Sequence, residues 1–191
     1  MKLSSIDPAA IFLAIAVIVV IALLVGAIVF LRRMHRRRMQ KRFGPEYERL
    51  AAEMGSHKRA EARLFARERR VAGYNIHPLR EDDRMRYLRV WRSVQAKFVD
   101  NPGEAVAKAD QLLTEAMADR GYPMAEFERR SADLSIHHPM VVQNYRAAHD
   151  IALKHRNGKA STEDLRQAMI HYRTLFTELV SGEPLERAAA A

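Results

Sequence analysis

Residues 101–117 read NPGEAVAKADQLLTEAM, and this stretch is the clearest indicator of the fold class. Asn101 is a good N-cap, and Pro102 suits the first helical turn, where its missing N–H is not needed. The apolar residues that follow step by three and four, which is the spacing of one face of an α-helix. They are Val106, Ala109, Leu112, Leu113, Ala116 and Met117. The stretch therefore predicts an amphipathic helix over about 103–119.

The chain on either side repeats this pattern. Apolar stripes with helical spacing occur around Trp91, around Phe127, and along residues 141–153 and 165–179. Ser161 and Asp164 form a capping-box-like pair before the last of them. No convincing run of alternating apolar residues competes. Short connections favour helices packed back on each other. We therefore predict an all-α bundle over residues 73–180, with five helices at about 80–100, 103–119, 123–134, 139–155 and 162–180.

Residues 43–72 have a different composition. A modest stripe of Tyr47, Leu50 and Met54 gives way, after Gly55, to a strongly charged segment with few apolar residues. A helix that is polar nearly all round is usually a solvated connector. We expect a charged stalk helix over 43–72, in one piece or bent at Gly55. At the other end of the chain, residues 181–191 are expected to form a flexible tail.

The N-terminal part predicts a membrane anchor. Residues 9–31 carry no charged or hydrogen-bonding side chain. As a helix they would extend roughly 35 Å, enough for the ~30 Å hydrocarbon core of a bilayer. A buried core helix and a cleaved signal peptide are the alternatives. The second is disfavoured because the positive charge follows the span instead of preceding it. We expect a transmembrane helix over 9–31 after a short N-terminal segment, residues 1–8.

A basic collar, residues 32–42, follows the predicted span. Its cations, with no acid among them, are Arg32, Arg33, Arg36, Arg37, Arg38, Lys41 and Arg42. The positive-inside rule places this flank and all later residues in the cytoplasm, with the N-terminus outside. The collar is expected to contact anionic lipid headgroups.

Within the predicted span, a row of small residues would permit two helices to approach closely and the protein to self-associate. This row consists of Ala10, Ala14, Ala22 and Gly26.

The charge distribution argues against nucleic acid as a partner. The 191-residue chain has a formal net charge of +9, of which the collar supplies most. Residues 73–191 contain 17 basic and 17 acidic residues, so the distal domain is neutral. A nucleic-acid-binding domain would concentrate basic residues there.

The chain also lacks cysteine. This absence excludes disulfides, thiolate metal sites and cysteine nucleophiles.

Local catalytic motifs are absent from the sequence. It contains no glycine-rich phosphate loop, no G-x-S-x-G elbow and no H-E-x-x-H pair. We therefore predict no catalytic residue, no cofactor and no metal. One alternative remains open, because histidine with a carboxylate can bind zinc or act as a general base. That alternative is a small-molecule or metal-binding sensor, or an enzyme, with a site near His137, His138, His149 and Asp150.

Six segments carry a resemblance to a known family: Arg42–Tyr47 (RFGPEY), Trp91–Asp100, Arg120–Pro123 (RGYP), Ala132–Ser135 (ADLS), Tyr145–His149 (YRAAH) and Ser161–Ala168. In these segments the chain resembles a bacterial family of single-span membrane proteins with a small helical cytoplasmic domain, whose members are often labelled simply as membrane or secreted proteins. The resemblance covers about residues 42–180. It implies this architecture, located in the bacterial inner membrane, and gives no residue a catalytic role.

These features favour a non-enzymatic interaction or scaffold module on the cytoplasmic face of the membrane. Helical surfaces suit groove or face-to-face recognition of a protein partner or of a second copy. The candidate partner surface comprises Tyr122, Tyr145, His149 and Arg166, chosen for their positions near helix boundaries and stripes. A further hypothesis is that the protein is a structural component of the cell envelope that acts mainly by self-association. Only the small-residue row supports this hypothesis.

Overall fold

The computed structural model describes the backbone of residues 8–181 and the side chains of residues 18–180, except those of 19 and 32. Residues 1–7 and 182–191 of the predicted terminal segments lie outside it. The described chain is all-helical, with no strand, which confirms the all-α part of the predicted fold class. Its helices are α1 (Pro8–Met54), α2 (His57–Val71), α3 (Glu81–Asp100), α4 (Pro102–Asp119), α5 (Phe127–His137), α6 (Val142–Arg156) and α7 (Thr162–Ser181).

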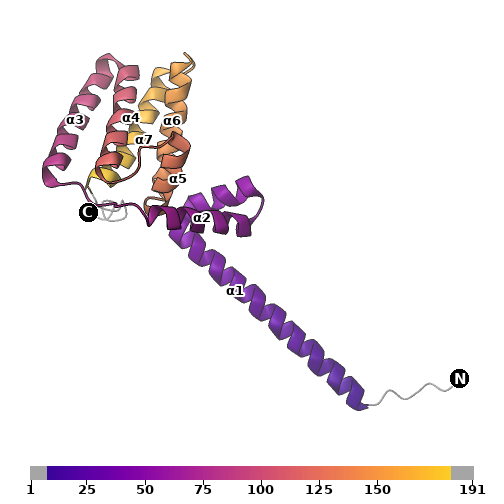
Figure 1. The fold of residues 1–191 in the computed structure, drawn as a ribbon. Coiled ribbons are helices and arrows are strands. Elements are labelled where there is room, and N and C mark those ends of the chain that lie inside the picture. The colour runs from indigo at the N-terminus through magenta and orange to yellow at the C-terminus, as the bar shows by residue number, and fades with distance from the viewer. Residues whose placement is uncertain (1–7, 182–191) are drawn as a thin grey trace, which may run out of the picture. The chain divides into compact units, whose positions relative to one another are not determined.

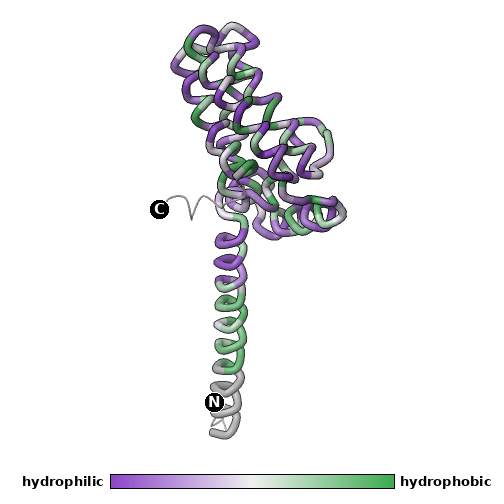
Figure 2. The backbone as a smooth tube through the Cα atoms, turned by 90° about the vertical axis from the view of Figure 1, so that its left-hand side faces the viewer, coloured by the Kyte–Doolittle hydropathy of each residue, from purple (hydrophilic) through white to green (hydrophobic). Residues whose placement is uncertain are grey.

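The chain divides into two compact units, residues 1–42 and 43–191. The first contains most of α1, whose apolar stretch is followed by the hydrophilic collar (Figure 2). Every described side chain between residues 18 and 31 is apolar and exposed. The described cations of the collar are exposed as well. Over the side chains that the structure describes, no helix combines the length and hydropathy that a bilayer crossing requires. Ala10 and Ala14 of the small-residue row lie outside those side chains.

In the second unit, α3, α4, α6 and α7 lie side by side as a four-helix bundle (Figure 1). Helix α7 packs against the other three. The core between them is apolar and aromatic, and the indole of Trp91 stacks on the ring of Phe176 at a centroid distance of 4.5 Å. The phenol of Tyr172 is fully buried and donates to Asp110 Oδ1 at 3.0 Å. The buried hydroxyl of Tyr172 therefore has a hydrogen-bond partner, as buried polar groups usually do.

Three predicted helices of the bundle region are close to the observed ones, and two begin later than predicted. Asn101 caps α4 as expected, accepting from the N–H of Glu104. By contrast, α5 begins at Phe127 and α6 at Val142, so Pro123 and Pro139 lie in the preceding loops. Helix α5 begins later than predicted because Gly121 adopts a φ of 91°, a left-handed conformation that ends α4 and turns the chain. The side chain of Tyr122 then enters the core before a new helix can start.

Residues 43–71 correct the predicted stalk. The end of α1 and helix α2 form a helical hairpin, called the hairpin below, with a break at Gly55 where φ is 60°. Its two arms face each other, and the Tyr47 hydroxyl donates to Glu61 at 3.0 Å. Helix α2 also packs against α5. One face of each arm is buried because each arm has an apolar stripe, while the opposite face stays exposed. The stripe residues are Phe43, Tyr47 and Leu50 on one arm and Ala60, Leu64 and Val71 on the other.

Candidate functional site

Two of the four residues of the predicted partner surface are not on the surface. Tyr122 and Tyr145 are 4% and 0% exposed, and both belong to the core of the bundle region. Their stripe positions reflect packing, so this part of the prediction is corrected. Arg166 is exposed on α7 and pairs with Glu163, one turn earlier. His149 is half-buried and stacks on Phe127 with the ring centroids 3.6 Å apart.

The histidines of the alternative site are not gathered into one centre. His137 and His138 lie at the C-terminal end of α5, whereas His149 stacks on Phe127 at its first residue. An eleven-residue helix separates these ends by roughly 15 Å. Asp150, next to His149, is exposed. Among the residues that the structure describes, no three histidine or acidic side chains are placed to hold a metal ion.

Each of these histidines has its own local environment. Burial lowers the pKa of His137, and the positive charge of Arg120 lowers it further. Burial also lowers the pKa of His149. Burial lowers the pKa of His138 although Glu178, whose Oε1 lies 3.0 Å from its Nδ1, opposes the shift. Contacts with neighbouring side chains, Glu178 for His138 and Phe127 for His149, are consistent with packing roles in α5 and α6.

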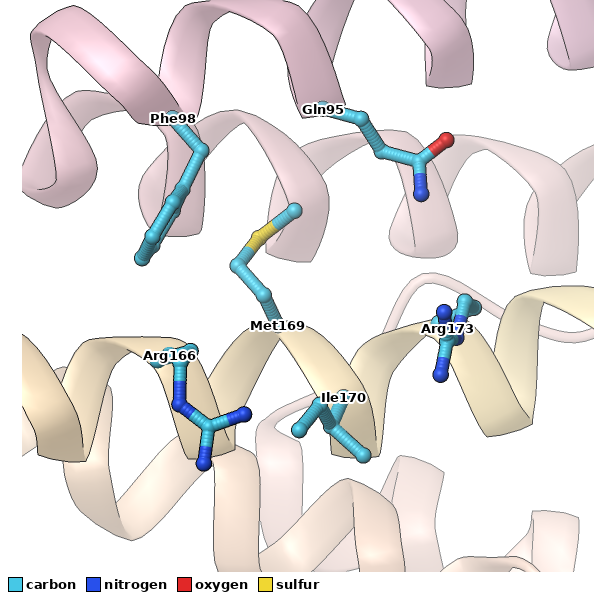
Figure 3. Close-up of a pocket in the computed structure, with 6 residues that line it drawn as sticks. All are labelled: Gln95, Phe98, Arg166, Met169, Ile170 and Arg173. Atoms are coloured by element: carbon cyan, nitrogen blue, oxygen red, sulfur yellow. The ribbon is translucent and has the colours of Figure 1, made fainter.

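A shallow groove of about 150 Å³ lies between α3 and α7 (Figure 3). Met169 extends from α7 toward Phe98 and Gln95 of α3, and the exposed side of the groove is flanked by Arg166 and Arg173. The groove is apolar at its base and cationic at its rim. It contains Arg166, the exposed member of the predicted partner surface.

The most distinctive polar arrangement in the second unit centres on Glu46. Its carboxylate is 0% exposed and accepts hydrogen bonds from three arginines on three different elements. Arg49, one turn along α1, donates through Nε at 3.1 Å and Nη2 at 3.0 Å. Arg67 of α2 donates through Nη1 at 2.7 Å. Arg146 of α6 donates through Nη1 at 2.6 Å and Nη2 at 3.2 Å. One carboxylate thereby joins both arms of the hairpin to the bundle.

The electrostatics of this cluster favour the ionised carboxylate. Burial alone would raise the pKa of Glu46, but the hydrogen bonds and positive charges of Arg49 and Arg146 outweigh it and lower the pKa to about 2. Burial lowers the pKa of Arg67 against the opposing attraction of Glu46. Arginine nevertheless stays protonated in proteins. Glu46 and its three partners are therefore all charged at neutral pH.

A cavity of about 470 Å³ lies over this cluster, and it is called the arginine cavity below. Its lining residues are Arg49, Glu53, Arg63, Arg67, Arg70, Glu128, Arg129, Ala132 and Arg146. They come from both arms of the hairpin, from α5 and from α6. A cavity of this size is within the range of ligand pockets. Most of its polar groups are N–H donors, so it suits an acceptor-rich ligand.

A second carboxylate orients one wall of the arginine cavity. Asp133 is 2% exposed and accepts from Arg70 through its Oδ1 and from the Tyr74 hydroxyl at 2.9 Å through its Oδ2. The bond to Asp133 raises the pKa of Arg70. The guanidinium of Arg70 is thus fixed between α2 and α5. This contact and the Glu46 cluster both connect the hairpin to the later helices.

Sequence analysis missed Glu46, Arg67 and Asp133, although a signal for two of them exists. Glu46 lies three residues after Phe43 and four before Leu50, which is a position on the buried stripe of its arm. Arg67 occupies the equivalent place between Leu64 and Val71 on the stripe of α2. A charged residue at a stripe position is typical of a buried ion pair. The missing information was the partner, because Arg146 is 100 residues away in sequence.

Three of the segments that carry the resemblance meet around this cavity. Residues 42–47 contribute Glu46, residues 132–135 contribute Asp133 and its neighbour Ala132, and residues 145–149 contribute Arg146. Comparisons of the chain with protein-family models, with curated proteins and with solved structures found no match.

Proposed function

We propose that this protein is a membrane-anchored, non-enzymatic helical module whose second unit binds a partner at the cytoplasmic face. The observation that carries the proposal is the first part of α1. An apolar helix whose described side chains from 18 to 31 are all exposed needs a nonaqueous surrounding. Residues 9–31 would fill a bilayer, and the collar from Arg32 to Arg42 would keep the following unit in the cytoplasm.

Membrane anchoring is tested by extracting membranes from cells that express the full-length protein at alkaline pH. We expect the protein to stay in the membrane pellet. The double variant Val20→Arg with Leu24→Arg should move to the supernatant, because each central arginine costs about 2.5–3.5 kcal/mol of insertion free energy. The matched control, Met34→Arg with Gln40→Arg, adds the same charges to the collar and should remain in the pellet. Release of the unaltered protein would refute the anchor.

The orientation and the binding role have separate tests. Because the positive collar predicts a cytoplasmic C-terminus, a C-terminal reporter that is active only in the cytoplasm should be active. A C-terminal reporter that is active only outside the cytoplasm should be inactive.

Cross-linking of the full-length protein in cells should capture a second copy or a stoichiometric protein partner. Capture of neither would refute the interaction role, and turnover of a substrate by the purified full-length protein would refute its non-enzymatic character.

A further inference from the structure

The arginine cavity contains more hydrogen-bond donors than its own carboxylates can use. Each of the three nitrogens of Arg49 donates one hydrogen bond, to Glu46 or Glu53. Arg67 uses one nitrogen, and Arg146 uses two. The Nε–H of Arg146 is buried and has no acceptor among the residues that the structure describes. A buried donor of this kind is usually satisfied by a ligand or by ordered water.

Two arginines of the cavity have no counter-charge among the described residues. Arg63 of α2 and Arg129 of α5 are exposed at its edge, and neither forms an ion pair with another described residue. They approach the cavity from two elements that pack against each other. Arg67 and Arg146, which are fixed by Glu46, line the same cavity. The cavity therefore combines positioned guanidinium groups with two that are free to engage a ligand.

Charge balance sets the class of ligand. The cavity contains six guanidinium groups, and the carboxylates beside them are Glu46, Glu53, Glu128 and Asp133. Among these described groups, the positive charges exceed the negative charges by two. A phosphate monoester carries about two negative charges at pH 7 and three strong acceptor oxygens. Arginine also matches phosphate geometry, because its planar fork donates two parallel hydrogen bonds.

We infer that the arginine cavity binds a phosphate monoester, with Arg63 and Arg129 as the groups that engage its oxygens. The inference goes beyond the proposed function and holds whether or not α1 crosses a membrane. The same chemistry is supplied by a soluble phosphate and by the headgroup of phosphatidic acid. Glu128, which lines the cavity and has no ion pair within the described chain, opposes the bound anion.

The test uses the full-length protein in detergent and inorganic phosphate as the probe. Titration calorimetry should give saturable binding to one site. Arg63→Gln and Arg129→Gln should each weaken binding about tenfold, as expected for the loss of a charge-assisted hydrogen bond. Glu128→Gln should tighten it by about two- to fivefold, because it removes a like charge. A purely structural role for these exposed side chains predicts no such opposite effects.

The matched control is Arg166→Gln, which removes an exposed arginine from the α3–α7 groove, outside the arginine cavity. Its phosphate affinity should equal that of the unaltered protein. All variants should keep the same far-ultraviolet circular dichroism and the same Trp91 fluorescence. Absence of phosphate binding by the unaltered protein, or an equal loss with Arg166→Gln and Arg63→Gln, would overturn the inference.

The source of the phosphate is distinguished by reconstituting the full-length protein in phosphatidylcholine nanodiscs, with and without phosphatidic acid. If the headgroup is the ligand, phosphatidic acid should slow hydrogen exchange in α2 and α5, and Arg63→Gln should abolish this protection. If the ligand is soluble, inorganic phosphate should protect these helices and phosphatidic acid should not. Protection by neither probe would refute the site, while leaving the alkaline-extraction result for the anchor unaffected.

Discussion

The bundle and the hairpin are both helical and both bury an apolar face, yet they are held by different interactions. The bundle has a continuous apolar core made of many side chains, including Leu113 and Trp91. The hairpin has short apolar stripes, and its connection to α6 passes through the single carboxylate of Glu46. In an apolar core many residues each contribute a small part of the stability, whereas in an ion cluster the stability depends on a single charged residue. The hairpin should therefore be far more sensitive to a single isosteric substitution.

The largest expected effect comes from Glu46→Gln. The change is nearly isosteric, but it leaves the buried guanidinium of Arg67, which is 7% exposed, without its counter-charge. Breaking a buried ion pair in this way costs about 3–5 kcal/mol. We expect hydrogen exchange over residues 57–71 to accelerate accordingly. Exchange in α4 and α7 should change much less, because the bundle core does not include this contact.

Glu163→Gln is the matched control for this substitution. Glu163 also pairs with an arginine, Arg166, but both side chains are exposed and lie within one turn of α7. Such surface pairs contribute about 0–1 kcal/mol. Equal effects of Glu46→Gln and Glu163→Gln on hydrogen exchange would mean that the buried cluster does not hold the hairpin.

Acid should loosen the hairpin through the same carboxylate. The pKa of Glu46 is lowered in the folded protein from 4.5 to about 2, so its charge contributes stability that is fully present above pH 4.5. This stability is lost as the pH falls from about 4.5 through 2, and the linked free energy is about 3 kcal/mol. Hydrogen exchange in α2 should accelerate over this range in the unaltered protein. In Glu46→Gln the acceleration should be smaller, and an unchanged acid response would assign it to other carboxylates.

The same contrast explains how much of the molecule the sequence could predict. The bundle helices were predictable because local apolar spacing and caps specify them, as the confirmed cap of Asn101 shows. The hairpin was predicted as a solvated stalk because the charges of residues 57–70 hide a stripe containing Ala60, Leu64 and Arg67. The cavity was not predictable, since its geometry depends on pairs distant in sequence. Arg70 and Asp133, for example, are 63 residues apart.

Gly44→Ala tests whether the hairpin also depends on its entry geometry. Gly44 has φ 46° and ψ −129°, a backbone conformation that residues with a Cβ rarely adopt. A Cβ there would also lie 3.0 Å from Met140 Sδ. We expect a loss of about 1–3 kcal/mol in the free energy of opening the hairpin, measured by hydrogen exchange in α2. Gly73→Ala is the control, because Gly73 has no positive φ. Similar losses in both variants would argue against a special role for Gly44.

The smallest effect should come from the bundle, where Ser161→Ala removes a helix cap. The Asp164 N–H donates to Ser161 Oγ at 3.1 Å, and the Ser161 N–H donates back to Asp164 Oδ2 at 2.8 Å. Loss of an N-cap costs about 1 kcal/mol. Because Trp91 stacks on Phe176 of α7, its fluorescence should report this loss as an earlier urea unfolding transition. Hydrogen exchange in α2 should stay unchanged under native conditions, since the cap does not touch the Glu46 cluster. Faster exchange in α2 with Ser161→Ala would instead show that the hairpin opens only when the whole bundle unfolds.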